Sequence, residues 1–273
     1  MLTRRMHIKT MGAMFAASRL SALAPETDFG AYTDAEKEKF MVSGKIISAT
    51  DIGHGVTHPV KVQLEVGGVT HAAAIQMIDK ELPDFFATDG TRATSRDCWR
   101  FNVAAYKLDR LLGLKMVTVE VQRAYQGKPA AFSWWVDDVM FEEADRVKKD
   151  VTPPDQESFD RQRCLCRVFD ELIINIDRNL ANLLITKSWK LALIDHSRAF
   201  NTYPGIRNTE NLTRCSRSLL ESMKGLTAAS VAKAEGPYLT SPERAAVLGR
   251  RDRIVEFFQN RIKEKGEENV LFG

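Results

Sequence analysis

Apolar and polar positions alternate along the first half of the chain, which is the pattern of β-strands. Residues 41–49 (MVSGKIISA) predict one strand, and residues 60–66 (VKVQLEV) alternate strictly. The glycine pair at 67–68 interrupts this run, and alternation resumes over 69–78. Two alternating runs around a glycine pair predict a β-hairpin. The chain is therefore expected to open with a strand, a glycine-containing loop and two further strands.

A helix and a second strand pair are predicted next. Apolar residues recur at helical spacing over 95–112, where Ser95 can cap the first turn and Gly113 stands where a helix commonly ends. Residues 116–123 and 129–136 alternate on either side of a glycine. These two segments predict another hairpin.

Helical spacing dominates the second half of the chain. The broadest apolar helix face is predicted over 155–176, and two short strands over 183–186 and 190–194. Further helices are predicted at 213–224 and 240–264. A β-rich half followed by a helical half predicts an α+β fold with two lobes.

The acidic stretch 137–143 is interpreted as the linker between these lobes. The predicted division is an N-terminal segment at 1–24, an N-lobe at 25–140 and a C-lobe at 141–273. A length of 273 residues fits one two-lobed domain or two small ones. No apolar run approaches the roughly 18–20 residues that a membrane span needs.

The distribution of charge argues against nucleic-acid binding. The chain has 39 basic and 36 acidic residues, and four of the basic ones lie in residues 1–24, which contain no acid. The remaining 35 bases and 36 acids leave a net charge of −1, whereas a nucleic-acid interface needs a clustered basic face. The four cysteines and five histidines show no zinc-binding spacing, and core packing is expected for all four cysteines.

The first 24 residues have the order of a bacterial export signal. Arg4 and Arg5 precede an apolar stretch, and Ala22-Leu23-Ala24 resembles a cleavage site. Two interpretations stay open: a twin-arginine signal for export to the periplasm, or an amphipathic N-terminal helix of a cytoplasmic protein.

Candidate chemistry concentrates in residues 175–200. A long helix is followed by a polar loop containing Asp177 and Asn182, and a strand hairpin then leads to Asp195. Two carboxylates and an amide oxygen at one edge suit Mg²⁺, which takes few protein ligands and leaves the rest to phosphates and water. Phosphoryl transfer needs such ligands and a carboxylate that orients the attacking hydroxyl. Taken singly, each of these residues is equally typical of a turn.

The same residues carry a resemblance to a known group of proteins. The pattern D-R-N-x-x-N-L-L at 177–184, followed by L-I-D-H-S-R-A-F at 193–200, resembles the catalytic and metal-binding loops of atypical kinases. Phosphatidylinositol 3/4-kinases, the HipA group and secretory-pathway kinases have similar patterns, and the chain most resembles a group of uncharacterised bacterial kinase-like proteins. The resemblance implies a two-lobed protein-kinase-like fold that uses ATP with Mg²⁺ or Mn²⁺. It further implies Asp177 as the catalytic base, Arg178 as a supporting residue, and Asn182 and Asp195 as metal ligands.

The first half contains a weaker sign of the same fold. Gly53, Gly55 and Thr57 lie in a loop between two predicted strands, which resembles a phosphate-covering glycine loop. The loop is not a Walker A motif, because no G-K-[ST] follows it.

The chain departs from typical kinases at one ion pair. Kinases carry a lysine on the third strand, paired with a glutamate on the following helix. By the resemblance, Gln76 and Asn102 occupy these positions, so both charges are replaced by neutral amides. Three interpretations follow: a degraded kinase, an active kinase whose phosphate-binding cation is relocated to Lys61, or an active but slow enzyme.

Three functional hypotheses stay open at this point. The first is an ATP-dependent phosphotransferase, the second a pseudokinase that serves as a nucleotide-binding or protein-binding scaffold, and the third an unrelated α+β binding domain. Asp177, Asn182 and Asp195 favour the first, whereas Gln76 and Asn102 favour the second. The phosphate acceptor can be a protein, a lipid or a small molecule, because acceptor choice depends on loops such as 200–217.

Overall fold

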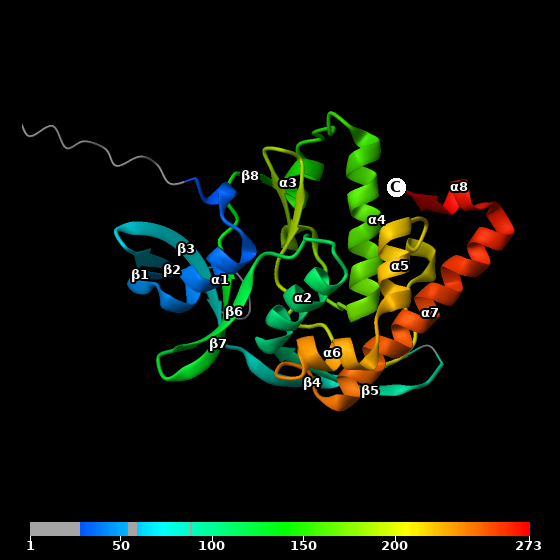
Figure 1. The fold of residues 1–273 in the computed structure, drawn as a ribbon, viewed down its shortest axis with the longest axis horizontal. Coiled ribbons are helices and arrows are strands. Elements are labelled where there is room, and N and C mark those ends of the chain that lie inside the picture. The colour runs from blue at the N-terminus through cyan, green and yellow to red at the C-terminus, as the bar shows by residue number, and fades with distance from the viewer. Residues whose placement is uncertain (1–27, 54–58, 88) are drawn as a thin grey trace, which may run out of the picture.

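The N-lobe is built on a five-stranded antiparallel sheet (Figure 1). The computed structural model describes residues 28–53, 59–87 and 89–273. The strands lie in the order β1 (Lys45–Asp51), β2 (Val60–Val66), β3 (Val69–Gln76), β7 (Lys128–Trp134), β6 (Glu120–Tyr125). The register aligns Lys61, Ala74, Ser133 and Glu120 in one row across four strands. Residues directly opposite one another share a face of a sheet, so these four side chains lie on the same face.

Two helices pack against this sheet and contact each other. The first, α1 (Asp34–Ser43), begins with a capping box between Thr33 and Glu36 and buries Phe40 against Trp134. The second, α2 (Arg100–Leu111), brings the side chain of Asn102 toward the end of β3. Ion pairs of α2 with Glu38 and Asp34 join it to α1. A short 3-10 helix, η1 (Phe29–Ala31), precedes α1.

A second hairpin connects the N-lobe sheet to α2 and reaches the C-lobe. It consists of β4 (Asp79–Phe86) and β5 (Arg92–Cys98). The amide of Cys98 donates to the carbonyl of Ser197 (2.8 Å), and the amide of Thr202 donates to the carbonyl of Thr94 (3.4 Å). β5 therefore runs antiparallel to the segment 197–202, although the two are about a hundred residues apart in the sequence.

The C-lobe is mainly helical, with one small sheet at the lobe boundary. That sheet has the order β10-β9-β8, and β11 and β12 form a separate parallel pair. The remaining elements are β8 (Val139–Glu142), α3 (Glu143–Lys148), α4 (Gln156–Ile173), η2 (Leu180–Asn182), β9 (Leu183–Thr186), β10 (Leu191–Leu193), η3 (Thr209–Asn211), β11 (Cys215–Ser216), α5 (Arg217–Gly225), α6 (Ala228–Glu235), α7 (Ser241–Lys265), α8 (Glu267–Val270) and β12 (Leu271–Phe272). Figure 1 shows α4 at the centre of the molecule, with α5 and α7 beside it and the N-lobe strands on its other side.

The central helix α4 is held by its apolar face. Phe159, Cys166, Phe169 and Ile173 are all buried, as the sequence pattern predicts, whereas Ile176, predicted on the same face, lies beyond the helix and is exposed. Full burial of a large apolar side chain stabilises a fold by about 1.5–3 kcal/mol, so this face fixes α4 against its neighbours. The site at the carboxyl end of α4 consequently stands on a rigid support. Among the described residues, no helix is long and apolar enough to cross a membrane.

The predicted α+β architecture with a β-rich and a helical lobe is confirmed, and several boundaries are corrected. Residues 41–43 belong to α1 rather than to a strand, and 95–98 belong to β5 rather than to the following helix. The predicted linker 137–143 contains β8, which pairs with β9 of the C-lobe. The helix predicted to reach residue 176 ends at Ile173. The segment proposed as an export signal, 1–24, lies outside the described residues.

Candidate active site

The site begins where α4 ends. The residue after the helix, Ile174, has a left-handed backbone conformation with φ of 50°. This conformation is unusual for a β-branched residue and costs on the order of 1–3 kcal/mol. Asn175 then fastens the turn, because its amide donates to the carbonyl of Asp170 (2.8 Å) and its side chain accepts from the amide of Asp177 (3.0 Å). The chain thus reverses direction immediately before the predicted catalytic residue.

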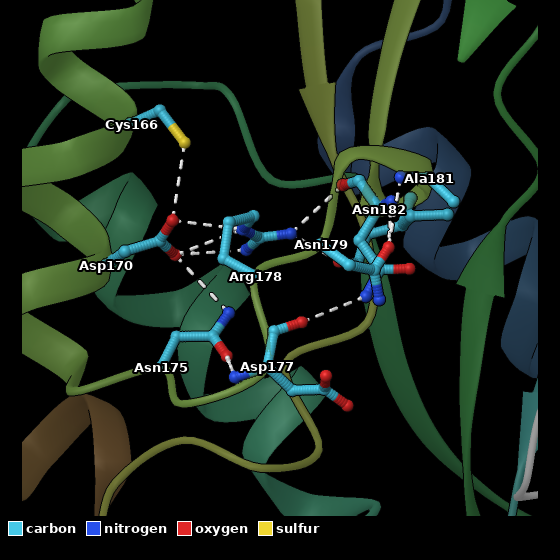
Figure 2. Close-up of polar contacts among 9 residues, drawn as sticks. Cys166, Asp170, Asn175, Asp177, Arg178, Asn179, Ala181 and Asn182 are labelled. Atoms are coloured by element: carbon cyan, nitrogen blue, oxygen red, sulfur yellow. Dashed lines mark hydrogen bonds and ion pairs between the residues drawn. The ribbon is translucent and has the colours of Figure 1, made fainter. Parts of the chain in front are cut away.

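A buried ion pair organises the following loop (Figure 2). The guanidinium of Arg178 donates to both carboxylate oxygens of Asp170 at 3.0–3.2 Å, and both side chains are only about one-eighth exposed. The Nη1 of Arg178 also donates to the carbonyls of Asn182 (3.0 Å) and Ile194 (2.8 Å). Burial lowers the pKa of Arg178, but the Asp170 carboxylate outweighs this effect and leaves the pKa raised. One arginine therefore joins α4, the loop and the end of β10.

Asn182 is oriented by the loop itself. Its Nδ2 donates to the backbone carbonyl of Asp177 (3.3 Å), and its own amide donates to the side chain of Asn179 (3.1 Å), as Figure 2 shows. The amide of Ile194 donates to the carbonyl of Asn182 (3.2 Å). Arg178 and these contacts bring Asp177, Asn182 and the residues before Asp195 together.

Asp195 lies where the two lobes meet. Its backbone is left-handed, with φ of 52°, and its Oδ1 accepts from Nε2 of Gln76 (3.3 Å) and from the amide of Ser197 (3.4 Å). The next residue, His196, is fully buried, and burial together with Arg178 holds the pKa of its ring well below the usual range. The amide of His196 donates to Oδ1 of Asn102 (2.6 Å). Asp195 is thus positioned by contacts with β3 on one side and its own turn on the other.

Gln76 and Asn102 lie in contact with each other. Nδ2 of Asn102 donates to Oε1 of Gln76, and both residues are buried. Each amide is therefore linked to the other and to the segment 195–196, Gln76 through Asp195 and Asn102 through His196. A neutral pair connects β3, α2 and the loop at the position where the resemblance implies an ion pair.

The carboxylate of Asp177 faces a second arginine. Nη1 of Arg198 donates to Oδ2 of Asp177 (3.1 Å), and Nε of Arg198 donates to Oδ2 of Asp97 on β5 (2.8 Å). Asp97 is nearly fully buried, whereas the Asp177 side chain is 43% exposed. Asp177 therefore presents its carboxylate to solvent while Arg198 holds it against the β4–β5 hairpin.

A buried carboxyl group on β6, that of Glu120, interacts electrostatically with Asp195. Glu120 is 1% exposed, and Oγ of Ser133 donates to its Oε2 (2.7 Å). The residues just before β6 run parallel to β10, because the amide of Thr118 donates to the carbonyl of Leu193 (3.3 Å). Burial raises the pKa of Glu120 to about 8, against the opposing hydrogen bond from Ser133 and with a contribution from Asp195. At neutral pH this side chain is therefore mainly uncharged.

The glycine loop and Lys61 complete the predicted residues. Gly53 lies two residues after the end of β1 with φ of 70°, and its amide donates to the side chain of Asp51 (2.8 Å). Gly55 and Thr57 lie outside the described residues. Lys61 is on the same sheet face as Gln76, but its Nζ lies 3.7 Å from the ring centroid of Trp135, in the segment that joins the lobes.

Sequence patterns alone missed three residues of this site. Asp170 lies on α4, seven residues before Asp177. A single acidic residue on a predicted helix has no pattern that would assign it to this site. Glu120 shares the polar face of the predicted strand 116–123 with its neighbours two residues away, which is the one pattern that could have singled it out. Arg198 falls inside the motif at 193–200, but its contacts depend on a hairpin that was not predicted.

Comparison with known proteins identifies the fold. No protein-family model matches the sequence, and no curated protein matches it either. Among solved structures, a hydra Fam20 protein determined with sugar is 16% identical and superposes with a TM-score of 0.64, covering 87% of this chain and 91% of that one. A Golgi casein kinase determined with Mn and ADP bound is 12% identical, with a TM-score of 0.60 over 87% of this chain and 78% of that one. The chain therefore has a kinase-like fold that is similar to the folds of these two structures.

Proposed function

We propose that this chain is a phosphotransferase that transfers the γ-phosphate of ATP to an acceptor hydroxyl with the help of Mg²⁺ or Mn²⁺. The observation that carries the proposal is the convergence of Asp177, Asn182 and Asp195, which Arg178 organises through contacts on both sides of the loop. The kinase-like fold and a neighbour that binds Mn and ADP support it. The acceptor can be a protein, a lipid or a small molecule.

The side chains around Asp195 fit a hard divalent cation. A carboxylate and a side-chain amide oxygen are the ligands that Mg²⁺ prefers. The Nδ2 of Asn182 is engaged with the carbonyl of Asp177, so its Oδ1 is the atom offered to a metal, and Asp195 offers its carboxylate. A metal held there would neutralise charge on the transferred phosphate. Gln76 would help to orient this carboxylate, because its Nε2 donates to Oδ1 of Asp195.

Asp177 is suited to orient the acceptor. Its carboxylate is exposed enough to meet a hydroxyl, and a positioned base of this kind contributes about 10²–10⁴-fold to a reaction rate. Arg198 fixes the direction of this carboxylate by donating to Oδ2, which directs Oδ1 toward an incoming hydroxyl.

A second candidate function is supported by a different observation. Gln76 and Asn102 form a neutral pair where active kinases have an ion pair, and this loss of the lysine favours a pseudokinase that binds nucleotide or a protein partner without transferring phosphate. Both candidate functions use the same cleft for binding, but only the phosphotransferase would transfer phosphate.

The two candidates are separated by a titration with ATP and Mg²⁺ or Mn²⁺ followed by thermal unfolding and by a phosphate-transfer assay. We expect ATP with metal to stabilise the wild type and EDTA to remove the effect, because bound ligand stabilises the folded state by mass action. Asp195→Ala should abolish the part of the stabilisation that depends on the metal, whereas Asp145→Ala, which removes a half-exposed acid on α3, should leave that part intact. Equal stabilisation of wild type and Asp195→Ala would contradict the metal assignment.

Turnover tests the base. Asp177→Asn should lower the rate of phosphate transfer by about 10²–10⁴-fold and change ATP affinity little. Stabilisation by ATP without measurable transfer by the wild type would favour the scaffold. A large loss of ATP affinity with unchanged turnover would instead make Asp177 a metal or phosphate ligand.

A further inference from the structure

A separate cavity lies on the C-lobe, along the N-terminal two-thirds of α4 and beside the strand β12. Its volume is about 540 Å³, within the range of about 300–1,000 Å³ that is usual for small-molecule sites. None of its lining residues belongs to the site described above. In Figure 1 the C-terminus lies beside α4 on the side away from the N-lobe sheet. We call this cavity the arginine pocket, after the four arginines that line it: Arg161, Arg163, Arg167 and Arg214.

The arginine pocket has an excess of positive charge. Its lining contains four guanidinium groups and two carboxylates, those of Glu157 and Asp160, so the balance is +2. Arg163 and Arg167 are four residues apart on α4, a spacing at which like charges repel and destabilise a helix by about 0.2–0.5 kcal/mol. A cluster of this kind costs stability unless a ligand compensates for it.

The acids of the pocket do not satisfy all four arginines. Arg161 pairs with Glu157, and Arg163 lies 3.7 Å from Asp160. Within the described part of the chain, Arg167 and Arg214 have no carboxylate at ion-pair distance. The Nε atoms of Arg161 and Arg214 are buried and lack a hydrogen-bond partner among the described residues. An unsatisfied buried donor costs about 1–3 kcal/mol, so the described surroundings of these two arginines do not use all of their donors.

An aromatic ring holds two of the arginines in place. The guanidinium carbons of Arg161 and Arg214 lie 5.7 Å and 5.4 Å from the ring centroid of Phe272. Stacking of a planar guanidinium on an aromatic ring limits its motion and leaves its N–H edge available to an anion. Phe272 thus fixes donors from two separate segments, α4 and the residues before β11.

We propose that the arginine pocket binds a small molecule that carries two or more phosphate groups. Arginine forks match phosphate oxygens in paired, charge-assisted hydrogen bonds. A cavity of 540 Å³ exceeds the size of a single phosphate, and four guanidinium groups provide more donors than one phosphate can use. Glu157 and Asp160 disfavour anions of low charge, because only a polyanion gains enough attraction to overcome their repulsion. The proposal does not depend on the function of the cleft.

Pyrophosphate is the probe that tests this proposal on the full chain. Divalent metal ions are removed from the buffer with a chelating resin, because dissolved EDTA is itself a polyanion, and binding is followed by calorimetry. We expect pyrophosphate to bind the wild type more tightly than inorganic phosphate does. Arg167→Gln/Arg214→Gln should weaken pyrophosphate at least about tenfold, since each arginine contributes charge-assisted hydrogen bonds. Arg253→Gln, which removes an exposed arginine of α7, is the matched control and should not change binding.

A second measurement uses the unaltered protein and locates the ligand. Cys164 lines the arginine pocket and is partly exposed, whereas the other three cysteines are buried. Pyrophosphate should therefore slow the alkylation of Cys164 by iodoacetamide, and sodium chloride at the same ionic strength should not. Absence of protection, equal protection by chloride, or pyrophosphate binding that the double variant leaves unchanged would each overturn the proposal. The Asp195→Ala variant should keep both effects, and their loss there would assign the binding to the cleft instead.

Discussion

The two walls of the cleft are held together by different chemistry. The C-lobe wall relies on charge: Arg178 clamps Asp170, and Arg198 bridges Asp177 and Asp97. The N-lobe wall is neutral at β3 and α2, because these two elements contact residues 195–196 through the amides of Gln76 and Asn102. Glu120 on β6, an acid of this lobe that interacts with Asp195, has its pKa raised to about 8 by burial.

This difference shows that neutral side chains can hold a strand, a helix and a loop together at a cleft. Removing one partner of a buried ion pair leaves an uncompensated charge, whereas replacing both by neutral groups can cost little. The amide pair joins β3, α2 and the loop at 195–196. Under the proposed function, β3 would offer the phosphates an amide instead of a lysine, and the predictions below test how far that matters.

The largest effect on stability is expected when the buried ion pair of the C-lobe wall is removed. Arg178→Ala leaves Asp170 buried without its partner and removes the donor to two carbonyls. We expect the free energy of unfolding to fall by about 3–5 kcal/mol in a urea titration. Lys187→Ala, which removes a fully solvated pair with Asp138, should cost less than about 1 kcal/mol. Similar losses of unfolding free energy in the two variants would mean that the Arg178–Asp170 ion pair is not important for stability.

In the N-lobe wall, the expected effect is a dependence of stability on pH that comes from Glu120. The folded-state pKa of Glu120 is raised from 4.5 to about 8, so the wild type loses stability from this group as the pH rises from about 4.5 through 8. Glu120→Gln does not titrate, and its stability relative to the wild type should therefore increase over the same window, by at most a few kcal/mol. Urea unfolding at several pH values without nucleotide measures this difference, and Glu256→Gln on the surface should show none. A difference that stays constant with pH would mean that Glu120 is charged in the folded protein.

Restoring the ion pair sharpens the comparison further. Gln76→Lys/Asn102→Glu should be tolerated, because lysine and glutamate can repeat the donor and acceptor contacts with Asp195 and His196. ATP affinity should rise, since a lysine supplies the missing cation. Gln76→Lys alone should be less stable than the pair, with a coupling of about 0.5–3 kcal/mol in thermal unfolding. Purely additive effects of the two changes would mean that the positions are not the counterparts of the kinase ion pair.

The smallest effect is expected at Lys61. Its ammonium group stacks on Trp135, and such a contact stabilises a protein by about 0.5–1 kcal/mol at an exposed position. Lys61→Ala should therefore cost about this much in thermal unfolding, while Lys61→Arg retains the stacking. ATP binding should weaken less than in Asp195→Ala. A complete loss of ATP binding in Lys61→Ala would instead identify Lys61 as the relocated phosphate contact, and the loss should then be smaller in the Gln76→Lys/Asn102→Glu background.

The sequence was most informative where the site is local. Asp177, Asn182 and Asp195 lie within twenty residues, and the helix, loop and strands around them follow from periodicity alone. The contact between Gln76 and Asn102 was also expected, because the resemblance aligns their positions on a strand and the next helix. The structure places these side chains as described, and their roles in binding and catalysis stay predictions.

Long-range pairing is what the sequence could not indicate. Residues 79–98 contain charges, Pro83 and Gly90, which are typical of a loop, and Ser95 has the character of a helix cap. Pairing between β4 and β5 overrides that local preference and extends the strand to Cys98. Arg198 could not be assigned for the same reason, because its buried partner Asp97 is on this hairpin.

The contact between β5 and the segment 197–202 has a consequence for motion. Rotation about the connection at 135–138 cannot separate the lobes while the amides of Cys98 and Thr202 remain bonded across them. The cleft can therefore open on that side only when the hydrogen bonds of these two amides break and the amides are exposed to water. Their rates of hydrogen exchange should report the free energy of lobe opening, and slow exchange there would mean that the β5 side of the cleft rarely opens to substrates.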